Sequence, residues 1–379
     1  MKPIAIVPML LTVAVLCIPC QAEPPAGTDA KPLFDMKDIF PSTRIPDISV
    51  AKDGTVMAFA ASGRVLRRSE DGGKTFSPVQ VVGNDAGGSS IVDANSGDVM
   101  VVRSRSGSLW RSSDHGKTWK REEITVKPNA AGHGEVGGVP VQTNCSESGV
   151  TLLYGKHKGR LIMPARVMPP KGSNAQETWM YHYNTAIYSD DGGKTWQTAG
   201  PVQTGTGEGT LAELSTGAIY YNSRSHMSID SRRRIAMSYN GGDMFVDWRV
   251  CETLREVGQP FYFRYGTKPS YGCAAGLIRL PLELTGGKDV LLFSTPDNPG
   301  GHRLKMTVWA SFDRGQTWPV KRLVHEGPSA YSSLAVGPDG TIYLLFEQGK
   351  KRLHEAIALA RFNMEWLADG RDWRGMLKE

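Results

Sequence analysis

The feature that most constrains this chain is an octapeptide with the pattern Ser-x-Asp-x-Gly-x-Thr-aromatic, which occurs in four clear copies. The copies begin at Ser69, Ser112, Ser189 and Ser311, and a fifth copy, in which Asn240 replaces the Asp, begins at Ser238. The Asp of such a segment can accept hydrogen bonds from turn amides, and the Gly supplies the positive φ that a hairpin turn requires. The Thr and the aromatic residue then begin the next strand. We therefore interpret the repeat as a hairpin-forming device and exclude its aspartates from the catalytic candidates.

The spacing of the copies predicts the architecture. Their starts are separated by 43, 77, 49 and 73 residues, and the shorter gaps suit one blade of a β-propeller. Alternating apolar runs, which are typical of strands, lie between the copies. These runs are 55–60, 98–102, 160–167, 218–223, 290–294, 306–311 and 341–346. We expect an all-β fold, a single six-bladed β-propeller over residues 41–379, with four-stranded antiparallel blades of roughly 60 residues each.

The N-terminus predicts export. Lys2 precedes an apolar run from Ile4 to Ile18, and Ala22 offers a small residue for cleavage, which together are typical of a secretory signal peptide. We expect a signal peptide over residues 1–22, a leader over residues 23–40, and a periplasmic or extracellular protein. The run is too short for a comfortable membrane span, and no second apolar stretch could cross a membrane.

Five further blocks lie in order along the chain. They are Arg44-Ile45-Pro46, Glu208 to Leu214 followed by Tyr221-Asn222-Ser223-Arg224-Ser225, Arg303 before Met306-Thr307-Val308, Ala330-Tyr331-Ser332-Ser333-Leu334, and Phe346-Glu347-Gln348-Gly349. The octapeptide resembles the Asp box of bacterial neuraminidase repeats. Taken together with the Asp boxes, the five blocks resemble the exo-α-sialidases of glycoside hydrolase family 33, from about residue 42 to residue 367.

The resemblance implies a role for six residues. Arg44, Arg224 and Arg303 would bind the carboxylate of a sialic acid. Tyr331 would be the nucleophile and Glu208 its base, while Glu347 would brace Arg44. The residue types suit the chemistry, because guanidinium groups are planar, always charged donors that match a carboxylate. A tyrosine activated by a general base is a neutral nucleophile, whereas a carboxylate nucleophile would be repelled by the substrate's own negative charge.

One part of the family pattern is missing. Relatives carry an acid/base aspartate in a loop before the first Asp box, but here only residues 65–68 separate Gly63-Arg64 from Ser69. General acid catalysis is typically worth about 10²–10⁴-fold, so three alternatives stay open. Another carboxylate replaces the aspartate, with Asp47, Asp85 and Glu135 as candidates. Otherwise the enzyme acts on good leaving groups or on another acidic sugar, or the protein is a non-catalytic carbohydrate-binding propeller.

The sequence thus predicts an exported exo-α-sialidase that hydrolyses terminal sialic acid, or a related nonulosonic acid, with retention through a tyrosyl-enzyme intermediate. We expect no cofactor and no metal. We expect sialylated glycans or glycoconjugates as partners, a monomer, and no transmembrane segment. The formal charge of +6 is mild for 379 residues and the basic residues are scattered, so we expect no nucleic-acid partner.

Overall fold

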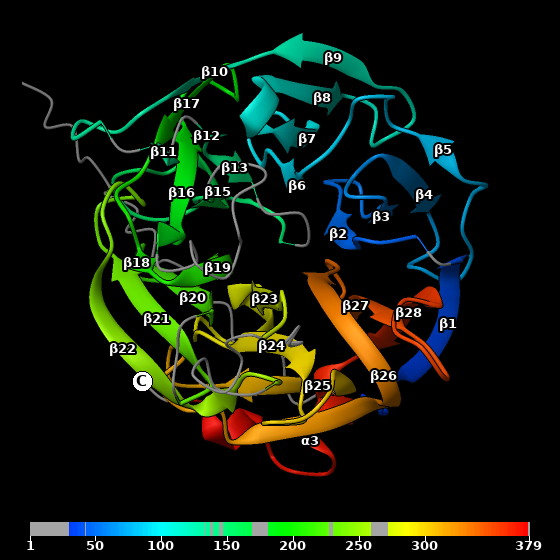
Figure 1. The fold of residues 1–379 in the computed structure, drawn as a ribbon. Helices are drawn as coiled ribbons and strands as arrows, with labels where there is room; N and C mark the ends of the chain where they lie inside the picture. The colour runs from blue at the N-terminus through cyan, green and yellow to red at the C-terminus, as the bar shows by residue number, and fades with distance from the viewer. Residues whose placement is uncertain are drawn as a thin grey trace, which may run out of the picture. The chain divides into compact units, whose positions relative to one another are not determined.

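The computed structural model describes residues 30–41, 43–132, 134–136, 139–143, 147–168, 181–226, 230–258 and 272–377. The chain divides into two units, Met1–Ala30 and Lys31–Glu379, and the account below concerns the second. The predicted signal peptide therefore lies outside the described residues. The second unit is all-β, with strands that run through nearly its whole described length (Figure 1).

The first two sheets each contain four antiparallel strands in chain order. The first sheet comprises β2 (Asp47–Val50), β3 (Val56–Ala60), β4 (Val65–Ser69) and β5 (Gln80–Val81). The second comprises β6 (Ser89–Val92), β7 (Val99–Arg103), β8 (Ser108–Ser112) and β9 (Lys120–Glu123), with the short helix η1 (Ser104–Ser106) between β7 and β8.

The middle of the chain forms a seven-stranded sheet, a four-stranded sheet and a small hairpin. The third sheet contains β10 (Thr125–Lys127), β13 (Gln142–Thr143), β14 (Val150–Thr151), β15 (Leu161–Val167), β16 (Tyr183–Ser189), β17 (Thr195–Thr198) and β18 (Gln203–Thr204). The hairpin is β11 (Glu135–Val136) with β12 (Val139–Pro140). The fourth sheet contains β19 (Thr206–Glu213), β20 (Ile219–Ser225), β21 (Arg232–Ser238) and β22 (Val246–Arg255).

The remaining strands form one continuous seven-stranded sheet. It contains β23 (Gly276–Arg279), β24 (Leu291–Pro296), β25 (Leu304–Ser311), the long β26 (Val320–Val336), β27 (Ile342–Gln348), β28 (Ala356–Phe362) and β1 (Phe34–Pro41). The first half of β26 pairs with β25 and its second half pairs with β27. Short helices lie at η3 (Leu282–Leu284), α3 (Met364–Ala368) and η4 (Arg374–Met376).

Strand β1 differs from the sequence-based expectation. Residues 34–40 were expected to belong to a leader, but they form most of β1, which pairs antiparallel with β28. Its partner strand lies more than 300 residues away, so no local pattern announces the pairing. Ile39 and Phe40 are buried in the resulting sheet, and burial of two large apolar side chains stabilises this attachment.

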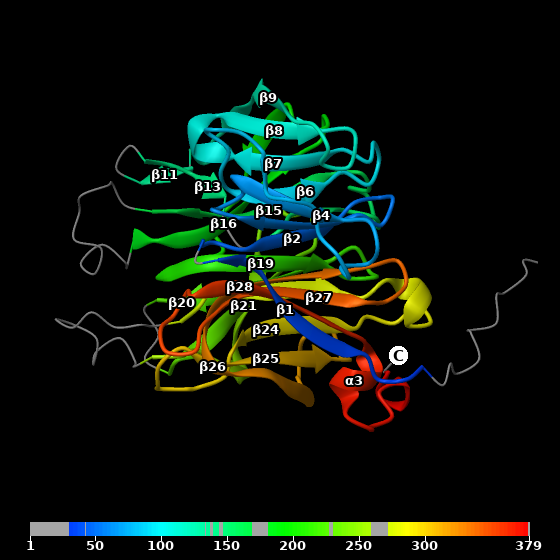
Figure 2. The same ribbon diagram turned by 90° about the vertical axis from the view of Figure 1, so that its right-hand side faces the viewer.

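Apolar side chains fill the space between neighbouring sheets. Met57 and Phe59 of the first sheet pack with Val99 and Val101 of the second, and equivalent clusters join the second to the third, the third to the fourth and the fourth to the fifth group of strands. Another cluster joins β3 to β27 and β28. Strands such as β3 are consequently buried on both faces, which explains their nearly continuous apolar sequence. Figure 2 shows the stacked sheets from the side.

The five octapeptides form the turns expected of them. In the first copy, Asp71 accepts hydrogen bonds from Ser69 Oγ and from the backbone N–H of Thr75, and Ser69 Oγ accepts one from Gly73 N–H. The fifth copy makes the same turn with Asn240 as the acceptor. Each copy joins the third and fourth strands of its group, for example β4 to β5 and β25 to β26. The group that contains β27 and β28 has no copy because β1, from the other end of the chain, supplies its outer strand.

The strands predicted from apolar alternation are confirmed. For example, the runs 55–60, 160–167 and 341–346 correspond to β3, β15 and β27, with ends that differ by one or two residues. None of the helices in the described part of the chain has the length and apolar character of a membrane span.

Candidate active site

Strand pairing brings the predicted residues together from distant parts of the chain. Glu208 lies near the start of β19 and Arg224 near the end of β20, and these strands pair with Gly209 opposite Ser223. Tyr331 lies on β26 and Glu347 on β27, and Ser332 pairs with Phe346. Antiparallel neighbours at such positions hold their side chains at one end of the sheet. Arg44 precedes β2 and Arg303 precedes β25.

Tyr331 and Glu208 form the centre of the cluster. The Tyr331 hydroxyl donates a hydrogen bond to Glu208 Oε1 over 2.7 Å, and both residues are buried. Arg224 Nη1 donates to the other oxygen of Glu208, Oε2, over 2.6 Å and to the Tyr331 hydroxyl oxygen over 2.9 Å. The phenol thus has a proton acceptor on one side and a cationic donor on the other, which is the arrangement of an activated nucleophile.

All three predicted arginines surround the same aromatic ring. The guanidinium carbons of Arg44, Arg303 and Arg224 lie 4.9, 5.4 and 5.9 Å from the centroid of the Tyr331 ring. Cations at this distance from an aromatic face are attracted by its quadrupole. The motif-based prediction that these three arginines share one site is therefore matched by their geometry.

Glu347 lies where the resemblance implies a brace for Arg44. Its Oε1 accepts a hydrogen bond from Arg44 Nε over 2.8 Å, and its Oε2 accepts one from the Tyr331 backbone N–H over 3.1 Å. His354 Nδ1 lies 3.0 Å from the same Oε2. The fully buried carboxylate therefore fixes the direction of the partly exposed Arg44 and the backbone position of Tyr331.

Arg303 is neutralised less completely than its two neighbours. Its Nη2 donates to the carbonyl oxygen of Gly272 over 3.0 Å, and its buried Nε has no hydrogen-bond partner. Within the described ranges Arg303 forms no ion pair with a carboxylate. A partly buried guanidinium in this condition favours an incoming anion.

The charges of the cluster shift the pKa values of the central pair in opposite directions. Burial, together with the negative charge of Glu208, raises the pKa of Tyr331 to about 12. Burial alone would raise the pKa of Glu208, but the guanidinium groups of Arg224 and Arg166 hold it well below its usual value. The pair therefore rests as a neutral phenol and an ionised carboxylate.

Three residues of this cluster escaped the sequence analysis. Arg166 Nη1 lies 2.9 Å from Glu208 Oε1, so a further arginine holds the proposed base. His226 Nε2 lies 3.8 Å from Glu208 Oε2, and the His226 ring lies 5.6 Å from the ring of His182. Burial lowers the pKa of His226 to about 3 and that of His182 to about 4. Arg166 and His182 lie on strands or turns whose sequence marks no function, and His226 was passed over although it follows the Asn-Ser-Arg-Ser block.

The three carboxylates considered as substitute acids lie apart from this network. Asp47 is completely buried, and it accepts hydrogen bonds from Ser90 N–H, Ser148 Oγ and Ser333 Oγ; burial raises its pKa. The Asp85 carboxylate binds Trp110 Nε1 and Arg121 Nε, and Glu135 is exposed in the β11–β12 hairpin. Asp47 contacts the Tyr331 strand through Ser333, but within the described ranges none of the three carboxylates bonds to Tyr331, Glu208 or the three predicted arginines. The β3–β4 connection comprises only residues 61–64.

Within the described ranges, no group of three or more His, Cys, Asp and Glu side chains is arranged to hold a metal ion. The roles proposed above for the site residues need none.

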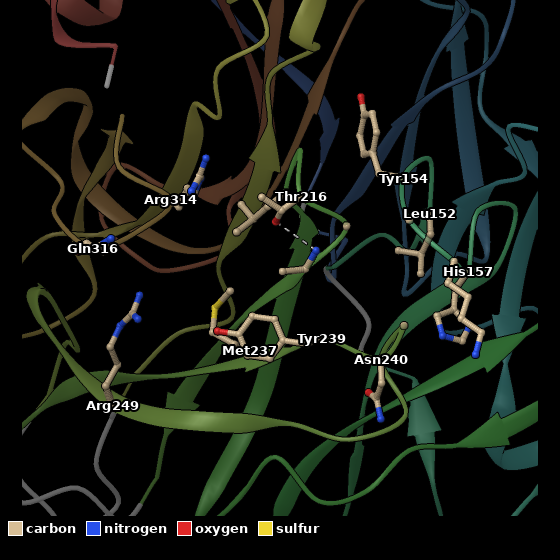
Figure 3. Close-up of a pocket in the computed structure, with 16 residues that line it drawn as sticks. Leu152, Tyr154, His157, Thr216, Met237, Tyr239, Asn240, Arg249, Arg314 and Gln316 are labelled. Atoms are coloured by element: carbon tan, nitrogen blue, oxygen red, sulfur yellow. Dashed lines mark hydrogen bonds between the residues drawn. The ribbon is translucent and has the colours of Figure 1, made fainter. Parts of the chain in front are cut away.

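A cavity of about 710 Å³ lies elsewhere (Figure 3). It is lined by turns that include Tyr154, Thr216, Asn240 and Arg314. Thr216 lies in the hairpin after β19, at the opposite end of that strand from Glu208, so the two positions are separated by roughly 20 Å along the strand. We place the chemistry at Tyr331 rather than in this cavity, because a buried tyrosine–glutamate pair among arginines is a chemically specific arrangement and cavity size is not.

A family model described as a BNR repeat-like domain matches residues 103–344. A sialidase of Micromonospora viridifaciens is 29% identical over 398 aligned positions, which cover 91% of this chain and 55% of that protein. A sialidase of Bacteroides fragilis is 26% identical over 309 positions, which cover 74% of this chain and 53% of that protein.

Solved structures support the same fold. The structure titled Hadza microbial sialidase Hz136 aligns with a TM-score of 0.63 at 21% identity, over 86% of this chain and 66% of that chain. At this identity the likeness concerns the fold. The chain spans about half the length of the two curated relatives that it matches.

Proposed function

This chain belongs to the sialidase superfamily with BNR repeats, and we propose that it is an exo-α-sialidase. It would release terminal sialic acid, or a related nonulosonic acid, from glycans or glycoconjugates with retention of configuration. The observation that carries this proposal is the Tyr331–Glu208 hydrogen bond of 2.7 Å within a ring of three arginines. No organic cofactor or metal is needed for this chemistry.

The arginines would hold the substrate's carboxylate beside Tyr331. Arg303 is the strongest anchor, because no protein carboxylate within the described ranges neutralises it. Arg44 is aimed by Glu347, so little conformational entropy is lost when it binds. Arg224 already holds Glu208 and the phenol oxygen, so it would link the bound carboxylate to the reacting pair.

In the first step, the Tyr331 oxygen would bond to the anomeric carbon while the bond from that carbon to the aglycone oxygen breaks. The phenolic proton moves to Glu208 Oε1, to which it already points. A free tyrosinate is scarce near neutral pH, because the pKa of Tyr331 is about 12. The proton therefore leaves as the new bond forms, and Arg224 stabilises the negative charge that develops on the phenol oxygen.

In the second step, water would attack the anomeric carbon and the bond to Tyr331 would break. Glu208 returns its proton to the phenol oxygen, and the proton lost by water goes to solvent, where it balances the proton taken up by the departed aglycone. Two displacements at one carbon give overall retention.

Departure of the aglycone is the step that this chain supports least. Neither Asp47, Asp85 nor Glu135 bonds to the Tyr331 network in the described residues. A missing general acid costs about 10²–10⁴-fold when the leaving group is poor and little when it is good. The alternative functions therefore stay tied to this observation: a weakly active or purely carbohydrate-binding protein, or a glycosidase for another acidic sugar.

We also propose the finer architecture and location. The apolar clusters between successive sheets, together with the pairing of β1 with β28, support a closed six-bladed propeller of which the long β26 serves two blades. The N-terminal apolar run supports export to the periplasm or the cell exterior.

The test compares an activated aryl sialoside with sialyl-lactose for the wild type and for Tyr331→Phe. We expect the wild type to cleave the aryl substrate faster, and Tyr331→Phe to lose most of this activity while it still binds sialic acid. Absence of turnover on both substrates by the wild type would reject the hydrolase and leave the carbohydrate-binding alternative. Equal rates on both substrates would show that an acid operates after all.

A further inference from the structure

A second hollow lies next to the segment that carries Arg44. It has a volume of about 370 Å³, and its lining comes from the β3–β4 turn, the end of the β5–β6 connection, the η1 turn with the end of β7, and β13. The backbone N–H of Ser62, in the β3–β4 turn, donates to the carbonyl oxygen of Ile45 over 3.2 Å. Ile45 is the neighbour of Arg44, so one wall of the hollow is held to the segment before β2 that presents the first predicted arginine.

The hollow is strongly cationic. Arg64, Arg103 and Arg105 line it, and no Asp or Glu does. All three arginines are exposed, and within the described ranges none forms an ion pair with a carboxylate. Arg111 on β8 and Arg121 on β9 differ, because each binds two carboxylates. These two arginines of the same sheet are therefore neutralised, whereas the three that line the hollow are uncompensated.

The carboxylate of Asp85, which directly precedes Ala86 of the lining, is occupied elsewhere. Asp85 directs its two carboxylate oxygens to Trp110 Nε1 and Arg121 Nε, and only its backbone carbonyl accepts a hydrogen bond from Arg103 Nη1, over 2.9 Å. The contact fixes Arg103 without cancelling its charge.

The backbone around the hollow holds Arg103 and Arg105 in place. Gly88 has a φ of +97°, and a Cβ there would lie 1.9 Å from the carbonyl oxygen of Val102, so a side chain is excluded. Ser104, at the start of η1, accepts a hydrogen bond from Thr143 N–H over 2.7 Å through its buried Oγ. This bond anchors the turn that presents Arg103 and Arg105 on either side.

We propose that this hollow is a second anion-binding subsite, which holds a second negatively charged group of the substrate: a carboxylate, sulfate or phosphate oxyanion. The inference rests on the proposed function, since it places the charge on the molecule whose carboxylate binds Arg44. Three guanidinium groups suit an oxyanion by charge and by their planar forks. The group would come either from the aglycone or from a substituent on the sialic acid ring.

Binding of an anionic aglycone in this hollow would also compensate in part for the missing general acid. Fixed positive charges beside a departing oxygen stabilise the negative charge that develops on it. The three arginines would then assist departure without a proton, at the place where the short β3–β4 turn leaves room.

The test compares three substrates of the wild type. Sialyl-lactose carries one charge, an α2,8-linked disialyl-lactose carries a second carboxylate on the aglycone, and a ring-sulfated sialyl-lactose carries it on the sugar. One charge-assisted hydrogen bond corresponds to about tenfold or more, so we expect kcat/KM for one of the two dianionic substrates to exceed that for sialyl-lactose by at least about tenfold. The favoured substrate identifies the source of the charge.

The double variant Arg103→Gln/Arg105→Gln should bring this ratio close to 1 and leave kcat/KM for sialyl-lactose within about twofold, because these residues do not touch the Tyr331 cluster. The matched control is Arg249→Gln, an exposed arginine that lines the cavity of Figure 3; it should leave the ratio unchanged. Higher ionic strength should lower the ratio in the wild type and in Arg249→Gln, but not in the double variant.

Three results would overturn the inference separately from the proposed function. A wild type that cleaves sialyl-lactose but shows a ratio near 1 for both dianionic substrates has no second subsite and is still a sialidase. If the wild type binds sialosides without cleaving them, the Kd values for the same three substrates are compared instead, and a Kd ratio near 1 again rejects the subsite. If Arg249→Gln lowered the ratio as much as the double variant does, the preference would come from general surface charge, and the second subsite would also be rejected.

Discussion

The central residues of the proposed mechanism are distinguished by their partners rather than by their types. Glu208 and Glu213 lie on one strand, both buried, five residues apart. Glu208 accepts the Tyr331 hydroxyl and two guanidinium groups, whereas Glu213 accepts the backbone N–H groups of Leu153 and Tyr154. The partners of Glu208 suit a role in catalysis, whereas those of Glu213 hold the backbone at Leu153 and Tyr154 in place.

These partners predict different consequences for the same substitution. Glu208→Gln removes the acceptor of the phenolic proton, so we expect kcat on an activated aryl sialoside to fall by about 10²–10⁴-fold. Glu213→Gln should lower the free energy of unfolding by about 1–3 kcal/mol, because a buried N–H loses its acceptor, with kcat per folded molecule nearly unchanged. Steady-state kinetics and urea unfolding of both variants check this. A Glu208→Gln variant as active as the wild type would remove Glu208 from the mechanism.

The two buried histidines behind Glu208 predict a pH dependence of stability. The folded-state pKa is about 3 for His226 and about 4 for His182, below the unfolded value near 6.5. Between these values the unfolded chain binds protons that the folded chain does not, so stability falls as pH is lowered below about 6.5. At pH 5 we expect a loss of roughly 2 kcal/mol per histidine relative to pH 7.

Urea unfolding at pH 7 and pH 5 measures this loss. A His182→Asn variant should show a smaller difference between the two pH values than the wild type, whatever its absolute stability. An unchanged difference would mean that His182 is protonated in the folded state or does not contribute.

At the scale of elements, the Asp-box turns were predictable because their information is local. Residues two to four apart supply both sides of these hydrogen bonds, as in Asp191 with Ser189 and Thr195. The strands between them were predictable from alternation. Arg166, His182 and the attachment of β1 could not be predicted, since each depends on which distant strand becomes a neighbour, and alternation does not specify partners.

The Asp-box turns also predict a separation of stability from activity. Asp191→Ala removes the acceptor for Ser189 Oγ, Lys194 N–H and Thr195 N–H. We expect the free energy of unfolding to fall by about 2–3 kcal/mol, with kcat unchanged. Asn240→Ala should cost less, since hydrogen bonds to a neutral amide are weaker than those to a carboxylate. Unfolding curves that rank the two variants in the opposite order would contradict this account of the turns.

At the scale of the whole molecule, the site depends on elements from nearly the entire chain. Arg44 comes from the region before β2 and Tyr331 from β26, and the two meet because neighbouring sheets pack on one another. The arginines, Tyr331 and Glu208, which were chosen from the order of the family blocks, lie in one cluster, because proteins that share this order of blocks share the fold; their roles stay predictions. The order of the blocks could not supply the cationic hollow, which is lined by segments of three different sheets.

Attachment of β1 to β28 predicts that the described strands unfold together. Phe40→Ala should lower the free energy of unfolding by about 3–5 kcal/mol, because Phe40 is buried between sheets. Phe34→Ala, in the same strand but 39% exposed, should cost clearly less. Thermal unfolding followed by tryptophan fluorescence and by circular dichroism should give one transition for both variants. A separate early transition in Phe40→Ala would show that β1 is a detachable arm.

The claim on which the account depends is that Tyr331 forms a bond to the sugar. A sialosyl fluoride that also carries fluorine at carbon 3 has a good leaving group, and the fluorine at carbon 3 destabilises the oxocarbenium-like transition states of both steps, so the intermediate accumulates. The wild type is incubated with it and digested, and the peptides are examined by mass spectrometry. We predict one added fluorosialosyl group, located on Tyr331 and absent from Tyr331→Phe. An adduct on any other residue, or substrate consumption without an adduct, would contradict the account.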